Sequence, residues 1–93
     1  MIESFRHKGL RQFYADDNAS KLPADMVERI RDILTALDSA EDDLEGLNRP
    51  SFRLHPLKGD LKGFWAVTVR ANWRIIFRFE KGRVRDVDLV DYH

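Results

Sequence analysis

Residues 64–79 read FWAVTVRANWRIIFRF, and this stretch decides the fold. Its first part, residues 64–70, is rich in aromatic and β-branched residues, which is typical of a strand that is apolar on both faces. In residues 73–79 an aromatic or aliphatic side chain stands at every second position, with Arg74, Ile76 and Arg78 between. A period of two is the pattern of a strand that buries one face. The sequence therefore predicts two strands joined at Ala71-Asn72.

A further strand is predicted after Lys81-Gly82, a dipeptide that favours a two-residue hairpin turn. This last strand does not keep one apolar face. Val84 and Val90 share one parity, whereas Val87 and Leu89 share the other. The mismatch predicts a β-bulge or burial on both faces.

The first half of the chain has helical periodicity instead. Residues 2–5 are predicted to be a short strand, and residues 7–14 place their large apolar side chains on one helical face. A second helix is predicted from Pro23, which suits a first helical position. Its apolar stripe consists of Met26, Ile30, Ile33 and Leu37. One more helical turn is expected around residues 43–45.

Residues 52–55 return to a period of two, with Phe52 and Leu54 on one face. The order of elements predicts an α+β domain, in which an N-terminal strand and two or three helices pack on one face of a largely antiparallel sheet of about four to five strands. The other face would carry Arg74 and Arg78, with His55 and the C-terminus at its rim. Trp65 and Trp73 are expected in the core, although tryptophans on a strand can also stack on bases.

Length and composition narrow the class of protein. The 93 residues make one small domain, predicted to span residues 1–93. The chain contains no cysteine, so neither a disulfide framework nor a thiolate metal site is available. No apolar stretch approaches the roughly 20 residues of a membrane span, and the first residues lack a signal-peptide pattern. A soluble, cytoplasmic protein without a membrane partner is expected.

The formal net charge of zero hides an uneven distribution. Residues 49–85 contain 10 Lys and Arg against two acidic residues, whereas residues 1–48 contain 6 against 11. A basic segment of this size predicts contacts with phosphates and hence with nucleic acid. The alternative is a solvated face that the acidic half neutralises.

Two short segments contain the residues best suited to catalysis. Residues 54–60 contribute His55 and Lys58, and the chain ends in Asp91-Tyr92-His93. Histidine titrates near neutral pH, and these groups together supply a base, an acid and a cation. That set is what RNA strand scission by its own 2′-hydroxyl requires, without a metal or any other cofactor. Metal binding by His55, Asp91 and His93 is disfavoured because the chain has no compact ligand spacing.

Three residues near the central turn are candidates for RNA binding. Arg70 and Arg74 are predicted phosphate contacts, since guanidinium groups pair well with phosphate. Asn72 can pair with adenine through two hydrogen bonds, although its place in a turn also explains it. His7, at the start of the first helix, is expected to have a surface or capping role.

These motifs together resemble a known family. Residues 1–10 read MIxSFxHKGL, residues 54–60 read LHPLKGD, residues 65–75 read WxVxVRANWRI, and the chain ends in DYH at residues 91–93. This combination is similar to the HigB toxins, which belong to the RelE-like superfamily of bacterial toxin–antitoxin systems. The likeness covers nearly the whole chain; between about residues 15 and 50 it is one of pattern only.

The resemblance implies a RelE-like fold and a ribosome-dependent mRNA endonuclease. Such toxins cut the codon in the A site of the 70S ribosome, use the 2′-hydroxyl as nucleophile, and leave a 2′,3′-cyclic phosphate and a 5′-OH. By position, the catalytic residues would be His55, Asp91, Tyr92 and His93. RNA and its phosphates would be held by Lys58, Arg70, Asn72 and Arg74. The partner would be a HigA-like helix-turn-helix antitoxin, and operator DNA would be bound only through that antitoxin.

Two other functions stay open from the residues alone. A toxin of the same fold could inhibit DNA gyrase without catalysis, as ParE-like proteins do, but such proteins generally lack this histidine-rich site. A small RNA- or protein-binding module is the other alternative. In that case removing residues 91–93 would change neither growth inhibition nor RNA integrity.

Overall fold

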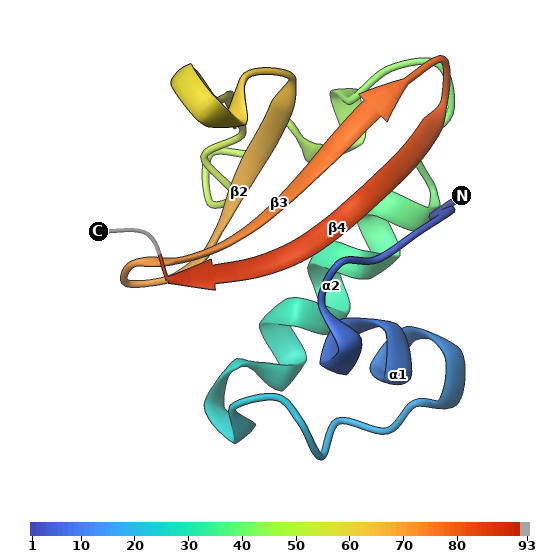
Figure 1. The fold of residues 1–93 in the computed structure, drawn as a ribbon, viewed down its shortest axis with the longest axis vertical. Coiled ribbons are helices and arrows are strands. Elements are labelled where there is room, and N and C mark those ends of the chain that lie inside the picture. The colour runs from blue at the N-terminus through green and yellow to red at the C-terminus, as the bar shows by residue number, and fades with distance from the viewer. Residues whose placement is uncertain (92–93) are drawn as a thin grey trace.

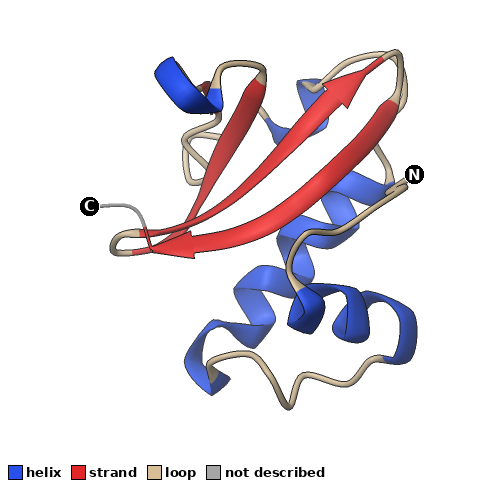
Figure 2. Cartoon of the chain, in the orientation of Figure 1, coloured by secondary structure: helices blue, strands red, loops and turns tan. Residues whose placement is uncertain are grey.

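The computed structural model describes residues 1–91 and has two helices and four strands in that part of the chain (Figures 1 and 2). The helices are α1 (Lys8–Asp16) and α2 (Val27–Asp38). The strands are β1 (His55–Pro56), β2 (Phe64–Arg70), β3 (Trp73–Glu80) and β4 (Arg83–Asp91). Three short 3₁₀ turns are η1 (Ala24–Met26), η2 (Glu45–Leu47) and η3 (Gly59–Leu61). Within residues 1–91 neither helix is long and apolar enough to cross a membrane.

The four strands form one antiparallel sheet in the order β1-β2-β3-β4. Two tight turns join the three long strands. Ala71-Asn72 connects β2 to β3, and Lys81-Gly82 connects β3 to β4. Lys81 and Gly82 have φ values of 51° and 81°, the positive values that a type I′ hairpin turn needs. Both predicted turns are confirmed.

The last strand contains the irregularity that its sequence predicts. Ile76 pairs with Asp88 and Arg78 pairs with Arg85, so β4 holds one more residue than β3 over this interval. Asp86 lies within it with φ of 55°, a left-handed conformation. The bulge lets Val84, Val87 and Leu89 all point into the core, although their spacing in the sequence breaks the period of two.

Two predicted strands are shorter than expected. Residues 2–5 make only two isolated parallel bridges to β4, Ile2 to Val84 and Phe5 to Val87. The expected strand at residues 52–55 is reduced to His55–Pro56, because Arg53 has φ of 51° and interrupts the extended backbone. Phe52 is nevertheless buried, and its carbonyl accepts a hydrogen bond from the Thr68 amide at 2.7 Å.

The helices begin close to where the sequence places them. His7 is the N-cap of α1, and its Nδ1 accepts a hydrogen bond from the Leu10 amide at 3.1 Å. The expected capping role of His7 is therefore confirmed. Pro23 precedes η1, so the α-helical part of the second helix starts later than predicted, at Val27.

The sheet has two unequal faces. The helices cover one face, and Figure 1 shows α2 lying across it with α1 packed alongside. The main core lies there, and Trp65 and Trp73 pack against it as predicted. The opposite face, called the outer face below, buries only a small cluster of Phe64, Ala66 and Ile76. Leu57, Leu61 and Val90 flank that cluster. The predicted α+β arrangement with helices on one face is confirmed.

Candidate functional site

His55 belongs to the outer face, because it pairs with Ala66, whose side chain lies in the outer cluster. Its Nδ1 lies 2.7 Å from the carbonyl oxygen of Arg53. A carbonyl can only accept, so Nδ1 carries the hydrogen and donates it to Arg53. The left-handed backbone of Arg53 brings this carbonyl to the imidazole. The local structure thus presents a half-buried histidine whose ring is oriented by this hydrogen bond.

Arg74 lies on the same face, where it pairs with Thr68 of β2 and with Val90 of β4. Its Nη1 donates to the carbonyls of Ala71 at 2.6 Å and Trp73 at 3.1 Å. These bonds fix the guanidinium beside the turn between β2 and β3. Both use Nη1, so the guanidinium retains other N–H groups that a phosphate can accept from.

The pairing of the strands sets the separation of these two residues. His55 aligns with Ala66 and Ile76, and Arg74 lies two residues beyond Ile76 on the same strand. With standard strand spacing and rise, the backbones of His55 and Arg74 are about 12 Å apart. Two long side chains on one face can reach a single ribose and its phosphate across that span. The outer face therefore brings together a candidate proton-transfer group and a candidate phosphate-binding group.

Asp91 lies at the end of β4, paired with Trp73, and so at the same end of the sheet as Asn72 and Arg74. Figure 1 shows β4 ending beside the turn between β2 and β3. Directly paired residues lie on the same face of a sheet, so Asp91 is on the face of Trp73, which packs toward the helices. Asn72 is exposed in its turn. Tyr92 and His93, the other two predicted catalytic residues, lie outside the described residues.

Lys58 and Arg70 differ in their relation to this face. Lys58 is exposed at the start of η3, in the loop that passes over the outer cluster, three residues after His55. Arg70 instead makes an ion pair with Asp25 in η1, and both side chains are more than half exposed. The contact draws Arg70 toward the helices. An exposed ion pair contributes little free energy, so Arg70 can exchange Asp25 for another anion.

Two arginines that the sequence did not single out as site residues also lie at the outer face. The guanidinium carbons of Arg6 and Arg78 are 5.7 and 4.4 Å from the centre of the Phe64 ring. Strand alternation places Arg78 on this face, and that signal was available in the sequence. Nothing in the sequence relates Arg6 to Phe64, because 58 positions separate them along the chain.

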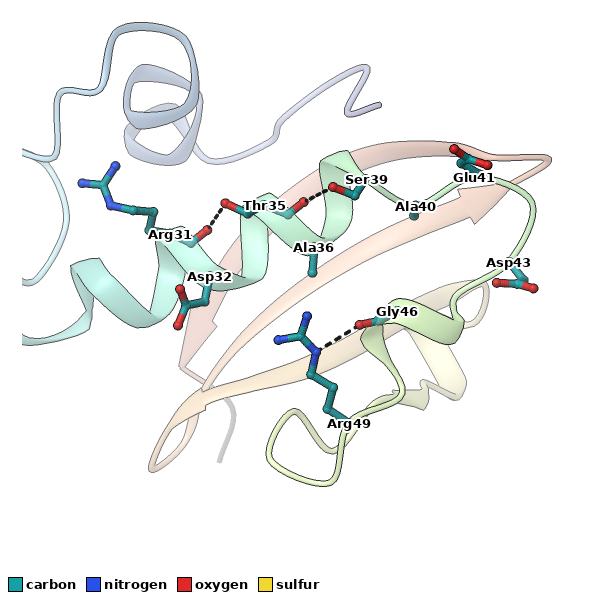
Figure 3. A pocket seen from close by; sticks show the side chains of 10 residues that line it. All are labelled: Arg31, Asp32, Thr35, Ala36, Ser39, Ala40, Glu41, Asp43, Gly46 and Arg49. Carbon is teal, nitrogen blue, oxygen red and sulfur yellow. Dashed lines mark hydrogen bonds between the residues drawn. The ribbon is translucent and has the colours of Figure 1, made fainter.

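The helix-covered side has a hollow of about 510 Å³ between α2 and residues 41–49 (Figure 3). Small residues line its middle: Ala36, Ala40 and Gly46. Charged groups of both signs surround it, and Arg49 Nε donates to the Gly46 carbonyl at 3.2 Å. Within residues 1–91, none of the residues predicted to bind or cut RNA lines this hollow.

The pKa of Tyr14 is raised on the helical side of the molecule. The main cause is the hydrogen bond that its hydroxyl donates to Asp38 at 2.6 Å; partial burial and the charge of Asp38 act in the same direction. The bond joins α1 to the end of α2. It is a structural contact and lies apart from the outer face.

Comparison with known proteins now adds to this geometry. Residues 3–93 match the family model described as "RelE-like toxin of type II toxin-antitoxin system HigB". The chain belongs to the HigB family. Among its relatives is the Endoribonuclease HigB of Proteus vulgaris, which is 50% identical over 93 residues and covers 100% of both chains. Toxin HigB-1 of Vibrio cholerae is 32% identical over 83 residues, which are 88% of this chain and 87% of that protein.

A solved structure supports the fold of this HigB-family chain. The YoeB–YefM complex from Staphylococcus aureus contains a chain that matches with a TM-score of 0.63 at 17% identity. The match covers 100% of this chain and 95% of that one. At this identity the likeness concerns the fold alone. The expected RelE-like architecture and the expected family are both confirmed.

Proposed function

We propose that this HigB-family endoribonuclease cuts mRNA in the A site of the 70S ribosome. The 2′-oxygen of the codon attacks the adjacent phosphorus as its proton is removed, and the bond from phosphorus to the 5′-oxygen breaks as that oxygen is protonated. The products are a 2′,3′-cyclic phosphate and a 5′-OH. The observation that carries the proposal is that His55, oriented by its hydrogen bond to the Arg53 carbonyl, lies on the same sheet face as Arg74.

The chain's own residues supply each part of this reaction. His55 is suited to proton transfer, since imidazole is the commonest general acid or base and its Nδ1 bond to Arg53 orients the ring. Arg74 is suited to hold the phosphate and to stabilise the negative charge of the pentacoordinate intermediate. Asp91, Tyr92 and His93 are the other proposed catalytic residues. Lys58, Arg70 and Asn72 are proposed to bind the RNA, with Arg70 leaving Asp25 when RNA is bound.

As a member of a type II toxin–antitoxin family, the chain has an antitoxin partner. We propose that this antitoxin is a HigA-like helix-turn-helix protein and that operator DNA is bound only through it. The reaction needs no metal or other cofactor. The match of the family model to residues 3–93 supports a single toxin domain over residues 1–93. Because the proposed substrate is mRNA that is being translated, the proposed location is the cytoplasm.

The proposal is tested by mapping the 5′ ends of a transcript in a translating extract. The wild-type protein is expected to produce new 5′-OH ends within codons, and a His93→Ala, Asp91→Ala double variant is expected not to. An Arg11→Gln variant, changed at an exposed residue of α1, serves as the matched control. Identical maps for the wild type and the double variant would contradict the proposed catalytic residues. Equal cleavage of the same RNA without ribosomes would contradict ribosome dependence.

A further inference from the structure

Arg6 and Arg78 converge on one aromatic ring at the outer face. Arg78 lies in β3, where it pairs with Phe64 of β2 and with Arg85 of β4. Arg6 comes from the N-terminal segment beyond β4, where its amide donates to the Val87 carbonyl at 2.8 Å. Their guanidinium carbons lie 5.7 Å (Arg6) and 4.4 Å (Arg78) from the ring centre of Phe64. Two segments far apart in sequence thus hold two cations at one place.

The Phe64 ring is a support for the cations and does not itself present a binding surface. Only 4% of Phe64 is exposed, so a base cannot stack on it. Cation–π attraction holds a guanidinium near the ring and leaves its N–H groups free to donate. Gly63 leaves room for this arrangement, because a Cβ at that position would lie 3.0 Å from Arg78 Nη1.

Within residues 1–91, the ion pairs at this place do not balance its positive charges. Arg78 makes an ion pair with Asp86 at 3.5 Å, and both side chains are about half exposed. Within residues 1–91, Arg6 makes no ion pair with any carboxylate. Two guanidinium groups near one ring with one carboxylate leave an excess positive charge. An anion with several acceptor oxygens relieves that excess and fits the fork geometry of arginine.

We propose that Arg6 and Arg78 form a second phosphate-binding site, which holds RNA backbone away from the bond that is cut. Arg78 lies on the same strand and face as Arg74, four residues away, or about 13 Å along the strand. That separation is too long for one phosphate to contact both. The inference rests on the proposed function and adds to it a positioning site for RNA on the far part of the outer face.

The bound phosphate belongs either to mRNA next to the cut codon or to ribosomal RNA. The experiment measures toxin binding to three kinds of 70S ribosome: without mRNA, with mRNA that ends at the A-site codon, and with mRNA that continues beyond it. The codon carries 2′-deoxyriboses, so that the proposed reaction cannot consume it. Binding is measured over a series of salt concentrations for the wild type, an Arg6→Gln, Arg78→Gln double variant and the Arg11→Gln control.

The double variant is expected to bind roughly tenfold or more weakly than the control, because charge-assisted bonds to phosphate are lost. The slope of log affinity against log salt should fall by about one for each lost phosphate contact. Weakening on all three kinds of ribosome assigns the phosphate to ribosomal RNA. Weakening only when mRNA is present assigns it to mRNA. Affinity and salt slope equal to those of the control in every arm would overturn the inference.

A second variant keeps the inference testable if the double variant does not fold. Asp86→Asn removes the carboxylate that pairs with Arg78, and asparagine tolerates the left-handed backbone at this position. This variant is expected to bind ribosomes more tightly than the wild type and with a steeper salt slope. Unchanged or weaker binding would count against the site. Failure of the proposed function looks different, since the wild type would then fail to cleave an all-ribose A-site codon.

Discussion

The two faces of the sheet differ in what they bury and in what they expose. On the helix-covered face, Val67, Ile75 and Phe77 are completely buried in the main core. The outer face buries three residues and surrounds them with His55, Arg74, Arg78 and Arg6. Hydrophobic burial scales with the apolar area removed from water, so most of the stability comes from the first face. The second face is therefore able to carry charged groups for RNA without endangering the fold.

The largest effect is expected from a truncation on the helix-covered face. Phe77→Ala removes a fully buried ring and should lower the free energy of unfolding by about 3–5 kcal/mol. A domain of this kind has only about 5–15 kcal/mol in total. Urea unfolding followed by circular dichroism measures the change, with Arg11→Gln as control. A loss below about 1 kcal/mol would contradict the assignment of stability to this face.

His55→Ala is expected to have the opposite effect: a large loss of activity with little change in stability. Loss of a general acid or base should reduce single-turnover cleavage on programmed ribosomes by about 10²–10⁴-fold. The free energy of unfolding should change by less than about 1 kcal/mol, because within residues 1–91 the half-buried ring makes one hydrogen bond, to Arg53. Cleavage at the wild-type rate would remove His55 from the mechanism.

Arg74→Lys separates the charge of this residue from its geometry. Lysine keeps the positive charge but lacks the fork that bonds the carbonyls of Ala71 and Trp73 while still donating to a phosphate. Cleavage should fall by about 10- to 100-fold, equivalent to about 1.4–2.7 kcal/mol of transition-state stabilisation. The rate is compared with that of Arg74→Gln, which removes the charge as well. Full activity of the lysine variant would show that charge alone is required.

The smallest effect is expected on the helical side at Tyr14. Its hydrogen bond to Asp38 raises its pKa above the ordinary value of 10.0. A raised pKa in the folded state means that the stabilisation is complete below the unfolded pKa and is lost as the pH rises through the folded pKa. Tyr14→Phe should lower stability at pH 7 by about 1 kcal/mol.

The pH dependence provides the check on Tyr14. Unfolding measured at several pH values from 7 to 11 should show a smaller alkaline loss for Tyr14→Phe than for the wild type. Cleavage at neutral pH should not change, since Tyr14 lies away from the outer face. An equal loss of stability at alkaline pH in both proteins would assign the pH dependence to groups other than Tyr14.

The parts of the fold that depend on neighbouring residues could be predicted from the sequence. Lys81-Gly82 favours its turn locally, the broken parity of Val84 and Val87 predicts the bulge, and His7 stands where a helix needs a cap. The prediction of a strand at residues 52–55 was wrong at Arg53. A left-handed residue there interrupts the extended backbone, and the type of side chain does not reveal it.

The candidate site was harder to predict because its geometry depends on contacts between distant segments. The period of two correctly placed Arg74 and Arg78 on the outer face. It could not show that Arg70 pairs with Asp25, or that Arg6 reaches Phe64. Those contacts depend on how the helices and the N-terminal segment pack against the sheet. The assignment of Tyr92 and His93 remains a prediction from the sequence.

The central claim is that mRNA lies against the outer face and not against the helices. Because the chain has no cysteine, a photo-crosslinker can be attached at a single introduced one. Lys62→Cys places it in an exposed loop beside Phe64, and Asp32→Cys places it on the exposed side of α2. Crosslinking to A-site mRNA on programmed ribosomes should occur from the Lys62→Cys variant and not from the Asp32→Cys variant. The reverse pattern would contradict the account.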